Sequence, residues 1–88
     1  MKYRIIWDPQ AFIRLRRSWL ATGQSEAGLR AFDEIEQLLG EDAHLRGESR
    51  GSDRRILLVP PLGVRFLARQ ETGEVFVFDA WLFAKRRL

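Results

Sequence analysis

The chain has 88 residues, of which 45% are hydrophobic and 31% are charged, and its formal net charge is +3. This size and composition are ordinary for a soluble globule with one core, so residues 1–88 are expected to form a single domain. The absence of cysteine excludes disulfides, thiolate metal ligands and thiol nucleophiles. No apolar run is long enough to cross a membrane and residues 1–20 lack the pattern of a signal peptide, so a cytoplasmic protein without a membrane partner is expected.

Arginine supplies 13 of the 15 basic residues, the other two being Lys2 and Lys85. The guanidinium group suits bidentate contacts with phosphate or carboxylate and stacks on bases, so this bias favours a polyanionic or acidic partner. A genome rich in G and C would also favour arginine codons. Composition alone leaves both explanations open.

The first predicted elements are a short strand and a helix. Residues 2–7 alternate and are rich in aromatic and β-branched side chains, which predicts a strand that joins the sheet. Asp8 is a suitable N-cap and Pro9 suits the first helical position, where its missing donor costs nothing. The apolar face of this helix consists of Ala11, Phe12, Leu15 and Trp19.

A second helix is predicted after a break at residues 22–24, where Gly23 suits a helix C-terminus. It begins at Ser25 and is stopped by Gly40. Its apolar stripe consists of Ala27, Ala31, Phe32, Ile35, Leu38 and Leu39. A break this short predicts an antiparallel helix hairpin whose apolar stripes cover the same face of a sheet.

Residues 41–53 contain two glycines and alternating charges, so an exposed loop is predicted there. His44, the only histidine, has no second ligand nearby in the sequence, so no metal site is expected and no catalytic role is assigned to it. The basic residues in and directly after this loop are Arg46, Arg50, Arg54 and Arg55. They form either a phosphate-binding patch or an ordinary solvated segment.

Three further strands are predicted at Arg55–Val59, Val64–Arg69 and Glu74–Phe83, because these segments are rich in β-branched and aromatic residues. Two turn signals separate them. The run from Pro60 to Gly63 cannot continue a strand because two prolines remove two backbone donors. Gly73 supplies the positive φ that a short hairpin loop usually needs. An antiparallel three-stranded meander is therefore expected.

The period of two along a strand places Arg65 and Arg69 on one face, and makes the adjacent Arg54 and Arg55 point in opposite directions. Residues 75–78 are apolar at every position, which is typical of an inner strand covered on both sides. The helix hairpin can cover only one face of the sheet. The remaining face or edge therefore calls for a protein partner, since only residues 84–88 are left to cover it.

These elements predict an α+β fold with an N-terminal strand, an antiparallel helix hairpin and a three-stranded antiparallel meander, with the helices on one sheet face. The sequence contains no P-loop, no dinucleotide-binding glycine motif, no hydrolase elbow and no zinc-ligand spacing. No cofactor and no metal are therefore expected.

This order of elements resembles the RelE/ParE superfamily of bacterial type II toxin–antitoxin systems. Residues 5–15, IIWDPQAFIRL, are similar to the family's strand-to-helix start, and residues 31–39, AFDEIEQLL, to its second helix. Residues 51–81, from GSDRRILLV to EVFVFDAW, resemble its basic second strand and the hairpin that follows. The resemblance covers nearly the whole chain and consists of hydrophobic patterns.

The resemblance implies a small toxin that an antitoxin protein neutralises. RelE-like toxins cleave mRNA on the ribosome, with cationic side chains that offset the charge developing at the phosphate, whereas ParE-like toxins inhibit DNA gyrase without cleavage. By this resemblance Arg55 matches a basic residue of the second strand, and Arg65 is a displaced substitute for an arginine whose position falls on Gly63, so Arg55 and Arg65 are the candidate catalytic residues. Leu57 occupies the position of a second basic residue, which leaves the cationic set incomplete. The candidate target-binding residues are Arg46, Arg50, Arg54, Arg69, Lys85 and Arg86.

Two other classes of function stay open. One is a non-catalytic protein-interaction module that binds a partner, or forms a homodimer, through the uncovered sheet. The other is a nucleic-acid-binding domain, which the net charge of +3 favours only weakly.

Overall fold

The computed structural model describes residues 1–22 and 25–83, so the candidate residues Lys85 and Arg86 lie outside the described part of the chain. Two α-helices and a five-stranded sheet make up the described fold, which confirms the expected α+β class. In chain order, the elements are β1 (Arg4–Trp7), α1 (Pro9–Thr22), α2 (Ser25–Leu39), a 3-10 helix η1 (Ala43–Leu45), β2 (Glu48–Ser49), β3 (Arg54–Val59), β4 (Leu62–Arg69) and β5 (Glu74–Leu82).

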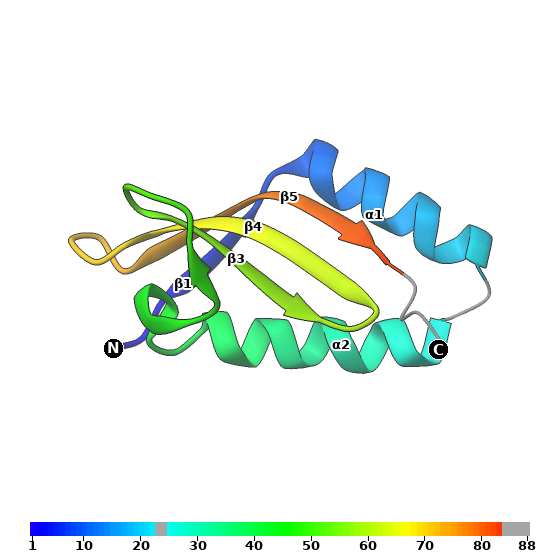
Figure 1. The fold of residues 1–88 in the computed structure, drawn as a ribbon, viewed down its shortest axis with the longest axis horizontal. Coiled ribbons are helices and arrows are strands. Elements are labelled where there is room, and N and C mark those ends of the chain that lie inside the picture. Colours follow the sequence, from blue (N-terminus) through cyan, green and yellow to red (C-terminus); the bar gives the residue numbers. More distant parts are fainter. Residues whose placement is uncertain (23–24, 84–88) are drawn as a thin grey trace.

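The strands lie in the order β1-β5-β4-β3-β2. Strands β3, β4 and β5 form an antiparallel meander, and β2 pairs antiparallel with β3. Strand β1 pairs parallel with β5, in the register that aligns Ile5 with Val75. The sheet is therefore mixed, and β5, which the sequence predicts as an inner strand, lies between β1 and β4 (Figure 1).

The start of α1 follows the sequence signals closely. The Asp8 carboxylate accepts a hydrogen bond from the Ala11 amide at 3.0 Å, and Pro9 is the first helical residue. One of the four amides that a helix start leaves without a partner is thereby satisfied. The predicted N-cap is confirmed.

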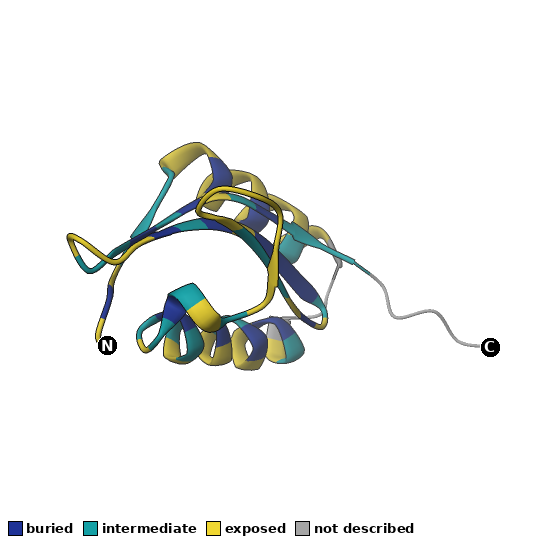
Figure 2. Ribbon diagram, turned by 60° about the vertical axis from the view of Figure 1, so that its left-hand side comes forward, coloured by how far each residue is buried: buried dark blue, intermediate teal, exposed yellow. Residues whose placement is uncertain are grey.

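The two faces of the sheet differ in what covers them. On the inner face, every second residue of β4 is buried, including Leu62, Val64 and Phe66. These side chains pack in one core with Ile35 of α2 and Leu15 of α1. Figure 2 shows the sheet curving over α2, while α1 runs along β5 past the end of β1. No helix of the described residues covers the opposite face, which is called the outer face below.

A β-bulge shifts the alternation along β5. Arg65 pairs with Asp79 while the next residue, Phe66, pairs with Val77, so Phe78 is the extra residue. Before the bulge Val75 and Val77 are buried, whereas after it the buried residue is Ala80. The inserted residue thus lets both halves of β5 send apolar side chains into the same core.

The segment at residues 41–53 is more structured than an exposed loop, which corrects the sequence prediction. It contains η1 and the short strand β2, and Ala43 is completely buried in the core. Gly47 has a positive φ of 67°, and a Cβ built there would lie 2.1 Å from the carbonyl oxygen of Ile56. The sequence did not predict this approach of Gly47 to Ile56, because one glycine at a tertiary contact produces no periodic pattern.

The strand boundaries differ slightly from those expected. Strand β3 begins one residue early, at Arg54, and β5 ends at Leu82 instead of Phe83. Strand β4 begins at Leu62, because only Pro60 and Pro61 form the turn. The expected hairpin after β4 is present, and Gly73 has the positive φ of 66° that its position requires.

The position of α2 over the inner face gives a stability prediction. Ile35 is fully buried, whereas Leu29 of the same helix is 55% exposed. Replacement of Ile35 by Ala is expected to lower the free energy of unfolding by about 2–5 kcal/mol, because it leaves a cavity. Leu29→Ala, the matched control, is expected to change it by about 0.5 kcal/mol or less. Urea denaturation of the two variants measures both values, and equal losses would contradict the observed orientation of α2.

Candidate functional site

Three arginines on the outer face each lie above an aromatic ring. The guanidinium carbon of Arg54 is 5.9 Å from the centre of the Phe78 ring. That of Arg65 is 5.8 Å from the Trp81 ring. The third pair joins Arg69 and Phe76, at 5.9 Å. Together they form an array of cations and rings that crosses β3, β4 and β5, called the arginine–aromatic face below.

The strand register explains why these groups meet. Side chains alternate along a strand, so Arg65 and Arg69 of β4 point away from the core that Phe66 enters. Phe76 and Phe78 have the same parity on β5. The expectation that Arg65 and Arg69 share a face agrees with these contacts, and Arg54 lies on that face with them.

Trp81 reaches this face because the residue beside it has no side chain. Gly63 pairs with Trp81 across β4 and β5. A Cβ built on Gly63 would lie 2.6 Å from the indole ring, so the ring lies directly over the glycine backbone. Arg65 then covers the ring from the solvent side, which leaves a layered arrangement of backbone, ring and cation.

A hollow of about 250 Å³ opens on this face next to the β2–β3 turn. The residues that line it are Arg50, Arg54, Arg55, Ile56, Arg65 and Phe78. Arg50 is paired with Glu48 at 2.8 Å. No carboxylate of the described residues lies within 4.0 Å of the guanidinium groups of Arg54 or Arg65. The hollow therefore concentrates positive charge, of which only that of Arg50 is paired with a carboxylate among the described residues.

The contacts that hold these arginines are weak enough to be exchanged. A cation over an exposed ring contributes about 0.5–1 kcal/mol. A hydrogen bond to a charged phosphate oxygen contributes about 1.5–3 kcal/mol. A bound phosphate can therefore draw an arginine from its ring, and the ring is then exposed for stacking.

Arg55 and Arg65, the two candidate catalytic residues, both line the 250 Å³ hollow, but their side chains leave the sheet on opposite faces. Arg55 pairs with Phe66 and points with it to the inner side of the sheet. Its Nε donates to the carbonyl of Arg46 at 2.5 Å and its Nη2 to that of Gly47 at 3.2 Å. Arg46, a candidate binding residue, is also held by the backbone, because its Nε donates to the carbonyls of Leu38 and Glu41. Of the described candidates, Arg50, Arg54, Arg65 and Arg69 are on or beside the outer face.

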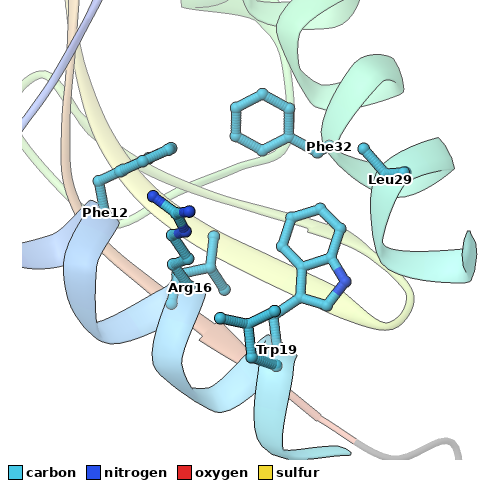
Figure 3. Close-up of a pocket in the computed structure, with 7 residues that line it drawn as sticks. Phe12, Arg16, Trp19, Leu29 and Phe32 are labelled. Carbon is cyan, nitrogen blue, oxygen red and sulfur yellow. The ribbon is translucent and has the colours of Figure 1, made fainter. Parts of the chain in front are cut away.

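An apolar groove of about 360 Å³ lies between α1 and α2, away from the arginine–aromatic face. Its lining residues are Phe12, Leu15, Arg16, Trp19, Leu20, Leu29 and Phe32. Figure 3 shows the Arg16 guanidinium extending among the aromatic rings of the groove. No carboxylate of the described residues forms an ion pair with Arg16. The groove thus combines apolar walls with one cation.

The described residues contain neither a metal-binding cluster nor a membrane-spanning helix. No group of three or more histidine or acidic side chains in residues 1–22 and 25–83 is arranged to hold a metal ion. Within the same residues, neither helix has the length and hydropathy needed to span a bilayer.

Sequence analysis missed the aromatic half of the site. Phe76, Phe78 and Trp81 were assigned only to an apolar inner strand. Their pairing with arginines depends on the register between strands and on the bulge at Phe78, which no local pattern reveals. The spacing within each strand was nevertheless a signal. Phe76 and Phe78 are two positions apart on β5, and Arg65 and Arg69 are four apart on β4, so each pair lies on a single face of its strand.

An ion pair beside this face predicts a pH dependence of stability. Glu74 accepts a hydrogen bond from Arg4, which lowers the pKa of the Glu74 carboxyl below its ordinary value of 4.5. Because the pKa is lowered in the folded state, the stabilisation is complete above pH 4.5 and is lost as the pH falls through the lowered folded-state pKa. The difference in melting temperature between wild type and Glu74→Gln is therefore expected to shrink between pH 7 and pH 3. Glu34→Gln is the control, and a constant difference for Glu74→Gln would contradict the ion pair.

Comparison with models of known protein families finds no match for this sequence. No curated protein matches it at a significant level. The function of the protein is therefore inferred from the geometry of the arginine–aromatic face and of the α1–α2 groove.

Proposed function

We propose that this protein is a toxin-like component of a bacterial type II toxin–antitoxin system, of the RelE/ParE kind, whose outer face binds ribosome-bound mRNA. DNA gyrase is the other target that the resemblance to these toxins suggests. The observation that carries the proposal is the arginine–aromatic face, with three arginines and three rings on one open side of the sheet.

This face suits single-stranded nucleic acid in both charge and shape. Phosphates of the backbone would pair with Arg54, Arg65 and Arg69, which have no ion-pair partner among the described residues. Bases would stack on the rings or on the guanidinium planes, and such stacking contributes about 1–3 kcal/mol per base. Double-stranded RNA would present no bases to the rings. A single-stranded segment is therefore the proposed ligand.

The proposal favours binding over cleavage. Attack by a ribose 2′-hydroxyl needs a proton donor at the leaving oxygen as well as cations. The outer face offers arginines, which stay protonated, and no histidine or tyrosine of the described residues lies in the 250 Å³ hollow. Arg55 points to the inner side, so it does not complete a catalytic set with Arg65.

The α1–α2 groove would bind the proposed antitoxin. Helix α1 carries Arg14, Arg16 and Arg17 and no acidic residue, and the groove walls are apolar. A segment with apolar side chains and a carboxylate placed to reach Arg16 would therefore complement this surface. The antitoxin is proposed to contain such a segment.

Replacement of Arg54, Arg65 and Arg69 together by Gln is expected to abolish binding to single-stranded RNA and to relieve any growth arrest that the wild type causes in a bacterial host. The slope of log K against log salt should fall in magnitude by about 2, since each lost phosphate contact removes about 0.7. Fluorescence anisotropy over a range of salt concentrations measures the slope.

The matched control replaces Lys2, Arg17 and Arg30 by Gln, which removes the same charge outside both the arginine–aromatic face and the α1–α2 groove. This control should keep RNA binding and growth arrest. Equal losses in both triple variants would show that net charge, and not the arginine–aromatic face, causes binding. Harmless expression of the wild type together with absence of RNA binding would reject the proposed function.

A protein-interaction module is the second candidate, because apolar side chains are also exposed on the outer face. Leu58 is 55% exposed and Phe78 is 38% exposed. The unpaired arginines of the same face would repel a second copy, so self-association is expected to be weak. Sedimentation equilibrium of wild type and Leu58→Ser tests this candidate. A wild-type dimer that is insensitive to salt and is lost in Leu58→Ser would favour it over nucleic-acid binding.

A further inference from the structure

A second, smaller hollow is lined mainly by polar side chains. It has a volume of about 170 Å³ and lies on the inner side of β3, behind the arginine–aromatic face. The residues that line it are His44, Ser52, Asp53, Arg55, Ala68 and Gln70. It is therefore rich in hydrogen-bond donors and includes one cation that stays charged at every physiological pH.

The guanidinium group of Arg55 is fixed in this position. Its Nε and Nη2 donate to the carbonyls of Arg46 and Gly47, which immobilise the plane of the group. The remaining N–H groups have no partner among the described residues. No carboxylate within 4.0 Å neutralises the charge. Arg55 is thus a preorganised cation whose remaining N–H groups can donate hydrogen bonds to a ligand.

His44 is fixed by a different contact. The hydroxyl group of Tyr3 lies 2.8 Å from His44 Nδ1. Burial raises the pKa of the Tyr3 hydroxyl, and the nearby carboxylates of Asp42 and Glu71 raise it further, so this group keeps its proton at neutral pH. Its contact occupies Nδ1, so Nε2 is the ring nitrogen left for a ligand. A tyrosine that is only 7% exposed thus holds the orientation of the histidine ring.

From this geometry we infer that the hollow binds a phosphate group, with Arg55 and the Nε2 proton of His44 as its donors. The hydroxyl of Ser52 and the amide of Gln70 are further donors in the same hollow. The carboxylate of Asp53 can only accept a hydrogen bond, so it suits a protonated oxygen of the phosphate. The ligand class is inorganic phosphate or a phosphate monoester. This site is distinct from the arginine–aromatic face, because the Arg55 side chain leaves β3 on the opposite side of the sheet, although Arg55 also lines the 250 Å³ hollow.

His44 is the only histidine in the sequence, so its ring signals report on this site alone. Sodium phosphate is titrated into the wild-type protein at constant pH and ionic strength, and the His44 ring proton signals are followed by NMR. Saturable movement is expected. Arg55→Gln should weaken binding about tenfold or more, since it removes charge-assisted hydrogen bonds. The phosphate affinity of Arg55→Lys should fall between those of the wild type and Arg55→Gln, because lysine keeps the charge but lacks the planar, bidentate guanidinium group.

Arg17→Gln is the matched control, because Arg17 lies on α1, outside both hollows, and its loss changes the net charge equally. It should bind phosphate within about twofold of the wild type, as expected for a residue outside the site. Tyr3→Phe should weaken phosphate binding, because the histidine ring is no longer held in place. Dispersion of the amide signals verifies that each variant is folded.

Adenosine 5′-monophosphate and adenosine distinguish the source of the phosphate. A response to the monophosphate but not to adenosine supports a monoester ligand, and a response to inorganic phosphate alone supports the free ion. An equal response to adenosine and its monophosphate overturns the inference, since the phosphate would then contribute nothing. Immobile His44 signals in the wild type, or equal weakening by Arg17→Gln and Arg55→Gln, overturn it as well.

Discussion

The alternation of side chains along β4 is the constraint on which the two sides of this protein depend. Val64 and Phe66 are completely buried beneath the helices. Arg65 and Arg69, at the alternate positions of the same strand, lie on the outer face. The buried residues and the arginines of β4 cannot change faces separately, because a register shift of one residue moves every side chain of the strand to the opposite face. The buried core therefore fixes the position of every arginine on the outer face.

Helix α1 is tied to the sheet by aromatic packing at the end of β1. The rings of Trp7 and Phe32 stack with centres 5.3 Å apart. Phe12 meets the edge or face of both rings, at 5.8 Å from Trp7 and 6.2 Å from Phe32. Such pairs contribute about 0.5–1.5 kcal/mol beyond the area that they bury. This cluster joins β1, α1 and α2, and it forms the inner end of the groove proposed for the antitoxin.

Much of the fold could be predicted from local signals. The N-cap at Asp8 and the hairpin glycine at Gly73 are single-residue requirements of backbone geometry, so the sequence states them directly. The apolar stripe of α2 predicts the buried position of Ile35 for the same reason. Elements that depend on a distant partner could not be predicted. Strand β2 exists because Gly47 allows the chain to approach Ile56, and its two residues carry no strand pattern of their own.

The candidate site divides in the same way. The shared face of Arg65 and Arg69 follows from their spacing in one strand, whereas the choice between Arg54 and Arg55 requires the register with β4. The pairing of Tyr3 with His44 joins residues 41 positions apart, and no sequence pattern links them. The resemblance to toxins made Arg55 a candidate catalytic residue, but its side chain leaves β3 on the face opposite that of Arg65.

The bulge at Phe78 has a consequence for how this strand tolerates insertions and deletions. Because Phe78 has no partner in β4, it is the one position of β5 where a residue could be removed without breaking a ladder pair. Its removal would bring Val77 and Ala80 from three positions apart to two, so a regular alternation would keep both side chains on the inner face. Strand β5 could therefore lose this residue and keep its core, whereas the outer face would lose the ring that lies beside Arg54.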